Sequence, residues 1–202
     1  MFFGFYSLLV YQIQAIYITL FLVNRDMLTF YCCFTHLLSE IVSYLLKHIL
    51  KQPRPDNGAP VGGLFEGRYG MPSQHCHCFA YLSTMVLLLV FHYYRQQIDI
   101  NKKAFVLVVS TLCLILQISS RLYLRYHTVG QCLAGVALGT LSAVIFYLVG
   151  LYFFLPLSDQ ICAFKILRVL SFRKDLISEP PPTCQQQSLT RYKANQCRIK
   201  NS

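Results

Sequence analysis

Long apolar runs separated by short polar segments dominate the pattern of this sequence. Five runs can be distinguished, at residues 2–23, 27–47, 75–93, 104–123 and 129–155. Each has about the 20 residues that an α-helix needs to cross the hydrocarbon core of a bilayer. The pattern predicts an all-α fold, a polytopic transmembrane helical bundle of about five spans. The first run has neither a basic segment before it nor a small-residue cleavage site, so we expect a retained helix rather than a signal peptide.

The composition agrees with a membrane protein. Hydrophobic residues make up 55% of the 202 residues and charged residues only 13%, whereas a soluble domain carries about 25% charge. The net charge of +10 would fit nucleic acid in a soluble protein, but in so apolar a chain it favours anionic headgroups and phosphate substrates. We therefore expect a membrane and a lipid phosphate as partners, and no nucleic acid. Several of the nine cysteines lie inside apolar runs as small hydrophobes, which argues against a disulfide framework.

The composition changes after residue 156. Residues 1–156 form the predicted transmembrane domain, and residues 157–202 form a basic juxtamembrane segment and a tail. Cations alternate with apolar residues between Lys165 and Lys174, as in an interfacial helix. The proline run at 180–182 and the Gln-rich remainder are typical of disorder.

Two features inside the runs bear on packing. Gly135 and Gly139 stand four residues apart, a spacing that favours close helix contact. Glu40 is the one carboxylate inside an apolar run. We favour a structural role for it, as a partner of Lys47 or His36, over a catalytic role.

Three polar stretches, at residues 47–55, 69–75 and 120–127, lie where apolar runs end. No span separates the first from the second, and two spans separate the second from the third. All three therefore lie on one side of the membrane. They contribute cations, a small hydroxyl and histidines: Lys47, Arg54, Ser73, His75, Arg121 and His127. Fixed cations and a helix N-terminus suit a phosphoryl group, whose transition state spreads negative charge over three oxygens. Two histidines can supply a nucleophile and a general acid, although the residues alone do not tell which is which.

The spacing of these stretches resembles the three-part signature of the type-2 phosphatidic acid phosphatase superfamily. The parts are Lys47-x6-Arg54-Pro, Pro-Ser73-Gln-His75 and Ser-Arg121-x5-His127, and the resemblance covers about residues 40–135. The surroundings YGMPSQH and SRLYLRYHTVGQ look most like those of dolichyldiphosphatases, the lipid pyrophosphate phosphatases of the endoplasmic reticulum. The resemblance implies hydrolysis of dolichyl diphosphate to the monophosphate and phosphate through a phosphohistidine, without metal or other cofactor. It also implies carrier recycling for protein N-glycosylation.

The resemblance also assigns roles. His127 becomes the nucleophile and His75 the general acid. The phosphate-binding residues are Lys47, Arg54, Ser73, Gln74 and Arg121, and the supporting residues are Ser120, Arg125 and Gln131. For Arg125, contact with the second phosphate and contact with lipid headgroups both remain open.

Two positions depart from the superfamily pattern. Gln74 stands where glycine is usual, and Gln131 stands where aspartate is usual. At i+4 on a helix, Gln131 can face His127 and accept a hydrogen bond from its Nδ1. On this view, Gln131→Glu keeps an acceptor and adds a charge that raises the pKa of the histidine.

Alternatives follow from the same residues. The substrate could be phosphatidate, another lipid phosphate or a sugar phosphate, or the chain could be a non-catalytic membrane protein on a decayed phosphatase fold. The run His75-Cys76-His77-Cys78 matches no common zinc spacing. Six of the 18 Lys and Arg residues fall on the side of the three stretches and twelve on the other, so the latter should be cytoplasmic. The site is then expected to face the lumen of the endoplasmic reticulum.

Overall fold

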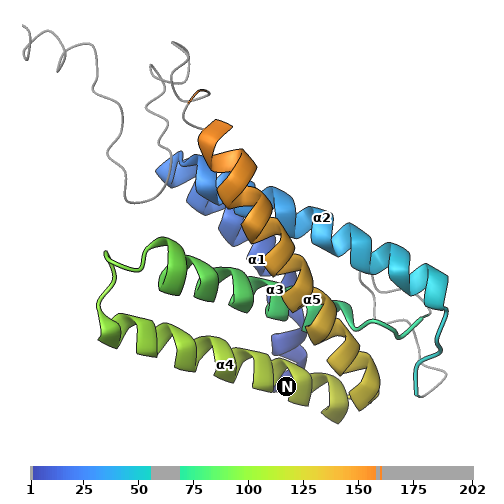
Figure 1. Ribbon diagram of the computed structural model, residues 1–202. Coiled ribbons are helices and arrows are strands. Elements are labelled where there is room, and N and C mark those ends of the chain that lie inside the picture. Colours follow the sequence, from blue (N-terminus) through green and yellow to red (C-terminus); the bar gives the residue numbers. More distant parts are fainter. Residues whose placement is uncertain (1, 56–68, 158–159, 161–202) are drawn as a thin grey trace, which may run out of the picture.

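In the residues that it describes, the computed structural model of the chain is a bundle of five helices (Figure 1). The structure describes residues 2–55, 69–157 and 160, with side chains from residue 12 onward. The helices are α1 (Phe2–Asn24), α2 (Met27–Leu50), α3 (Gln74–Leu88), α4 (Ile100–Tyr123) and α5 (Val129–Val149). The π-helical turns η1 (Leu89–Tyr93) and η2 (Gly150–Phe154) continue α3 and α5. The all-α fold and the five predicted helices are confirmed.

The start of α4 differs from the prediction. Residues 101–103 were expected in a polar turn, but they form the first helical turn after Asp99, whose backbone is extended. Lys102 lies 3.6 Å from the Asp99 carboxylate. Lysine is a good helix former, and at an exposed helix end its polarity is no obstacle. The expected interfacial helix and disordered tail lie outside the described residues.

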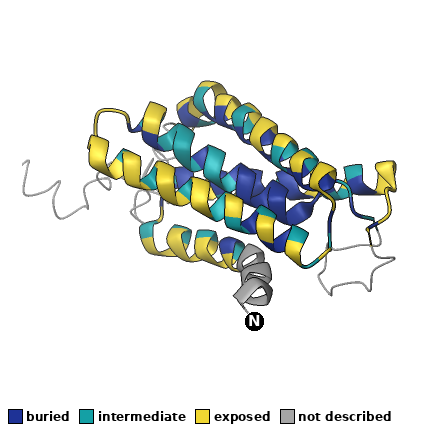
Figure 2. Ribbon diagram, turned by 90° about the horizontal axis from the view of Figure 1, so that it is seen from below, coloured by how far each residue is buried: buried dark blue, intermediate teal, exposed yellow. Residues whose placement is uncertain are grey.

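The outer surface of the bundle is apolar. Four helical segments are long and apolar enough to cross a membrane, namely Met27–Leu50, Gln74–Tyr93, Ile100–Tyr123 and Val129–Leu157, and Gln12–Asn24 adds a shorter apolar stretch of α1. Large hydrophobic side chains such as Phe105, Leu112 and Leu141 are more than half exposed. Exposed residues run along the outer faces of the helices in Figure 2, while buried ones gather inside. Such a surface suits a hydrocarbon solvent rather than water.

Helix α3 is the centre of the bundle. It contacts each of the other four helices, most extensively α5. An added Cβ at Gly135 would lie 2.5 Å from the carbonyl oxygen of Ser73, and one at Gly139 would overlap that of His77. The two glycines therefore let the backbones of α3 and α5 touch, as their spacing predicted.

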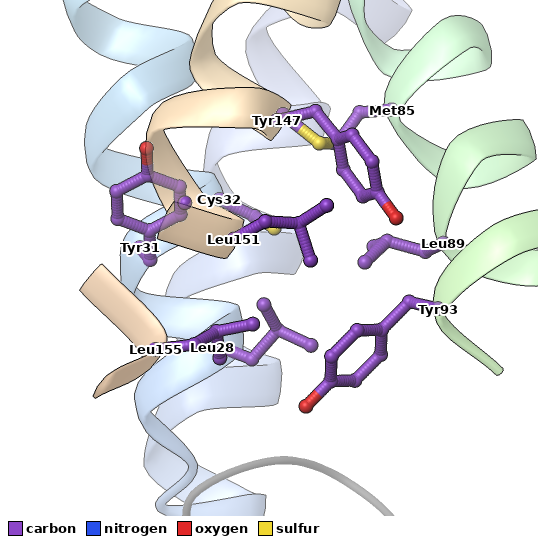
Figure 3. A pocket seen from close by; sticks show the side chains of 10 residues that line it. Leu28, Tyr31, Cys32, Met85, Leu89, Tyr93, Tyr147, Leu151 and Leu155 are labelled. Carbon is purple, nitrogen blue, oxygen red and sulfur yellow. The ribbon is translucent and has the colours of Figure 1, made fainter. Parts of the chain in front are cut away.

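The two ends of the bundle differ in polarity. One end holds an apolar cluster in which Leu28, Met85, Tyr147 and Leu155 pack around a small cavity (Figure 3). A cavity of about 210 Å³ lies beside it among α1, α2 and α3. No residue of the three polar stretches lines either cavity. The opposite end gathers the end of α2, the start of α3, the end of α4 and the start of α5, which are the segments that carry the three stretches.

Candidate active site

The first stretch leaves α2 and turns back along the site. Lys47 is fully buried in the last turns of α2. The helix ends where Lys51 adopts a left-handed conformation, with φ of 49°. Pro53 then pairs with Tyr69 in an isolated bridge, and the Gly70 N–H donates to the Gln52 carbonyl over 2.7 Å. These contacts hold the segment that carries Arg54, whose side chain is buried.

The second stretch forms the N-terminus of α3. Ser73 occupies the N-cap position with an extended backbone, yet its side chain makes no capping hydrogen bond within the described chain. Its N–H donates to the Gln131 carbonyl over 3.1 Å. The Ser73 hydroxyl and the first N–H groups of α3 are therefore placed to meet an anion. The side-chain amide of Gln74 donates instead to the Glu40 carbonyl over 3.3 Å and lies against α2.

The third stretch places its two arginines differently. Arg121 is fully buried at the end of α4, 5.3 Å from the centre of the Tyr126 ring, and it donates to the Ser120 hydroxyl over 3.5 Å. Arg125 is exposed in a left-handed conformation, with φ of 53°. The structure thus brings Arg121 into the buried site and leaves Arg125 at its rim.

His127 and Gln131 face each other at the start of α5. The His127 Nδ1 lies 3.2 Å from the Gln131 Oε1. The orientation of the Gln131 side-chain amide follows from two neighbours, one of which can only donate and the other only accept a hydrogen bond. The Thr128 N–H, a donor, contacts Oε1 over 3.3 Å, and the Pro53 carbonyl, an acceptor, contacts Nε2 over 2.9 Å. Because Oε1 can only accept, Nδ1 of His127 carries the proton and Nε2 presents its lone pair.

The surroundings of His127 keep its imidazole neutral. The side chain is 3% exposed. Burial, and then the positive charges of Arg54 and Lys47, lower its pKa from 6.5 to about 3. His75 also contributes to this lowering. Cations from the end of α2 and from the segment that follows it therefore act on one neutral imidazole, which is the arrangement that a nucleophile for phosphorus needs.

The structure therefore collects most of the predicted site residues in one buried group. Its members are Lys47, Arg54, Ser73, His75, Ser120, Arg121, His127 and Gln131, each less than 9% exposed, whereas the buried Gln74 turns its side chain toward α2. Sequence reasoning missed Gln52, which carries no recognisable signal. It also missed Thr128, although Thr-x-x-Gln at the start of an apolar run is the signature of the capping box seen here.

A second polar cluster lies deeper in the bundle. The His36 Nε2 is 3.6 Å from the Glu40 Oε1 and 3.2 Å from the Cys78 sulfur. These three groups could hold a metal ion by distance alone. Gln14, however, donates its Nε2 to the His36 Nδ1 over 3.1 Å, while its Oε1 accepts from Cys33 over 3.7 Å. The proton of His36 then sits on Nε2, within hydrogen-bond distance of the Cys78 sulfur, while the Glu40 Oε1 at 3.6 Å is an ion-pair neighbour. A protonated Nε2 has no lone pair to offer a metal ion.

This cluster settles two points left by the sequence. Glu40 contacts His36, as its structural interpretation predicted. The run of residues 75–78 does not converge on one point, because His77 bonds Ser39 over 2.9 Å and Cys78 bonds His36. The six cysteines that the structure describes all have free thiols.

Comparison with known proteins identifies the family. The model of the PAP2 superfamily matches residues 28–154, a range that contains all three stretches. The chain belongs to the PAP2 superfamily. It is a membrane phosphatase of that superfamily, which confirms the resemblance found in the sequence.

Several relatives are dolichyldiphosphatases. The chain is 27% identical to Dolichyldiphosphatase of Saccharomyces cerevisiae over 91% of this chain and 77% of that protein. It is 32% identical to Dolichyldiphosphatase 1 of Rhinolophus ferrumequinum and 30% identical to that of Homo sapiens, over 74% of this chain and 64% of each relative. The chain thus spans just under two thirds of these two proteins.

A solved structure supports the fold. The transmembrane PAP2-type phosphatidylglycerolphosphate phosphatase of Bacillus subtilis matches with a TM-score of 0.52 and 22% identity. The match covers 80% of this chain and 73% of that protein.

Proposed function

We propose that this membrane phosphatase hydrolyses dolichyl diphosphate to dolichyl monophosphate and phosphate through a phosphohistidine on His127. The observation that carries the proposal is the neutral, buried imidazole of His127 acted on by Arg54 and Lys47. The relatives named above supply the choice of lipid. The apolar outer surface lets an isoprenoid tail stay in the bilayer while the diphosphate enters the buried group from the membrane rim.

The chemistry proceeds in two displacements. The Nε2 lone pair of His127 attacks the terminal phosphorus, and the bond from that phosphorus to the bridging oxygen breaks. Protonated His75 gives its proton to the oxygen that leaves with the lipid monophosphate. Water then attacks the phosphohistidine and passes a proton to His75, which releases phosphate and restores both histidines.

The cations do electrostatic work throughout. Arg54 and Arg121 offer planar forks for pairs of phosphoryl oxygens, and Lys47 adds a point charge. Ser73 and the start of α3 complete the cradle. These groups stabilise the charge that a divalent ion would otherwise neutralise, so we propose turnover without a metal cofactor. Carrier recycling for N-glycosylation, at the lumenal face of the endoplasmic reticulum, would be the physiological role.

A substrate panel tests the proposal. Purified protein in detergent is supplied with dolichyl diphosphate, dolichyl monophosphate, phosphatidate, phosphatidylglycerolphosphate and a soluble sugar phosphate, and phosphate release is measured. We expect the largest kcat/KM for dolichyl diphosphate. Faster cleavage of phosphatidate or phosphatidylglycerolphosphate would reject the lipid assignment, and no release from any of them would favour a non-catalytic protein.

A further inference from the structure

The side chain of Gln131 contacts the chain on both of its polar atoms. Its Oε1 accepts from the His127 ring and from the Thr128 N–H. Its Nε2 donates to the Pro53 carbonyl over 2.9 Å and reaches the Gln52 Oε1 at 3.4 Å. The acceptor side holds the nucleophile, and the donor side holds a segment nearly eighty residues away in the chain.

The backbone of Gln131 and its neighbour Gly70 connect the site to the second stretch, residues 69–75. Its carbonyl accepts from the Ser73 N–H over 3.1 Å, at the start of α3. Gly70 lies directly against the amide, because a Cβ there would be 2.5 Å from Oε1 and 2.7 Å from Nε2. The Gly70 N–H in turn donates to the Gln52 carbonyl. Gln131, which is 1% exposed, therefore sits where all three stretches of the site meet.

We infer that Gln131 is a positioning residue that couples the nucleophile to the phosphate-binding segment 52–54, with Gln52 as its partner. Arg54 directly follows the carbonyl that Nε2 holds. The Gln131 amide thereby fixes the distance between the attacking nitrogen of His127 and the guanidinium that must bind the phosphoryl oxygens. This coupling is here called the Gln131 link, formed by Gln52, Pro53, His127 and Gln131.

The link requires an amide rather than a carboxylate. A glutamate at 131 would keep the oxygen that accepts from His127 but would turn a second oxygen toward the Pro53 carbonyl and Gln52 Oε1. Two acceptors would then face each other without a proton between them, and a buried acceptor left without its donor is costly. The donor contacts therefore change the expectation formed from the sequence, in which Gln131→Glu simply preserved the acceptor.

The pH dependence of Gln131→Glu separates the two roles. If the link operates, kcat/KM of the variant falls at least about tenfold at pH 7.5, by analogy with other lost buried hydrogen bonds. The kcat/KM of the variant relative to that of the wild type then rises as the pH is lowered, because a protonated carboxyl again offers a donor to the Pro53 carbonyl. If Gln131 acts only as an acceptor, the variant keeps the wild-type kcat/KM on the neutral plateau of the pH profile. Its kcat/KM relative to wild type then falls as the pH is lowered, since the added charge favours the protonated, unreactive imidazole.

Inhibition by orthovanadate reports on the other half of the link. Vanadate occupies the phosphoryl position, so displacement of Arg54 weakens its binding. We expect Gln131→Glu to raise the Ki at least about fivefold at pH 7.5, the loss of one charge-assisted contact. Gln97→Glu, the same change at an exposed position beyond η1, is the matched control and should alter neither readout.

Variants of Gln52, the partner of Gln131, provide an independent test. Gln52→Met keeps the length of the side chain but removes the acceptor, and Gln52→Glu restores one. We expect the Ki for vanadate to rise in the first variant and to return toward the wild-type value in the second. This pair decides the question even if Gln131→Glu cannot be isolated as folded protein.

The inference rests on the proposed site chemistry but not on the proposed lipid. Rates are measured with whichever lipid phosphate the wild-type protein turns over, and direct vanadate binding needs no substrate. The link would be overturned if Gln131→Glu kept the wild-type kcat/KM and vanadate affinity at pH 7.5. It would also be overturned if the kcat/KM of this variant relative to wild type fell as the pH was lowered. Equal vanadate affinities in Gln52→Met and Gln52→Glu would also overturn it.

Discussion

At the scale of single residues, the site depends on one imidazole that is kept neutral. Histidine in water is half protonated near its ordinary pKa, and a protonated ring cannot attack phosphorus. Burial and two nearby cations lower the pKa of His127 to about 3, while Gln131 fixes its tautomer. On the proposed mechanism, the same cations that bind the phosphate also prepare the nucleophile.

This lowered pKa predicts a pH dependence of stability. As pH falls below 6.5, the unfolded chain protonates His127 and the folded protein does not, so stability present above the unfolded pKa is progressively lost. The loss from this residue should reach about 2 kcal/mol at pH 5. The wild-type Tm in detergent should therefore drop more between pH 7.5 and 5 than that of His127→Gln, which has no proton to gain. Parallel drops would contradict the assigned pKa.

The two arginines of the third stretch should differ in how much their loss lowers kcat. Arg121 is buried in the site and Arg125 is exposed at its rim. Arg121→Ala should lower kcat at least about 10²-fold, the usual cost of removing a fixed group that stabilises transition-state charge. Arg125→Ala should cost about tenfold less, because an exposed charge acts through water. Equal losses measured with one substrate would place Arg125 on the phosphate itself.

At the scale of elements, the contact of α3 with α5 sets the geometry of the site. Ser73 is the N-cap of α3 and His75 lies in its first turn, while His127 directly precedes the N-cap of α5 and Gln131 lies in its first turn. The carbonyl of Ser73 rests against Gly135. Any side chain there must push the two helices apart next to the candidate active site.

Gly135→Ala tests this contact. We expect a loss of stability of about 1–3 kcal/mol, as in other overpacked cores, together with a clear drop in kcat. Gly130→Ala is the matched control in the same helix, because its added Cβ would meet only the Thr128 hydroxyl oxygen, at 3.9 Å. Thermal unfolding and rates of the two variants give the comparison, and equal behaviour would show that the close contact does not control the site.

At the scale of the whole molecule, the site occupies one end of a bundle whose opposite end encloses the apolar cluster around Leu28 and Met85. The end of α2, the start of α3 and the α4–α5 connection lie at the site's end, while the turn between η1 and α4 lies at the other. The distribution of Lys and Arg along the sequence predicts that this other end faces the cytoplasm. A glycosylation acceptor sequence inserted into the α2–α3 connection should thus be modified in microsomes, and one inserted between η1 and α4 should not. The reverse pattern would place the site in the cytoplasm.

The sequence predicted the helices and marked polar residues that the structure brings together, for physical reasons that can be named. Spans are set by runs of apolar residues, and the cations and histidines stand out because they are rare in such runs. The start of α4 was misplaced because lysine and asparagine signal a turn and an exposed helix end equally well. The donor side of Gln131 could not be predicted, since its contacts with Gln52 and Pro53 join segments 78 and 79 residues apart.

The central claim is covalent catalysis by His127, and trapping the intermediate tests it most directly. Wild-type protein is mixed with dolichyl diphosphate radiolabelled in its terminal phosphate, quenched in alkali and mapped by mass spectrometry. We predict label on His127 that is stable in alkali and lost in acid, as expected for a phosphorus–nitrogen bond, and no label in His127→Ala. Label on Ser73 or His75, or full turnover by His127→Ala, would contradict the account.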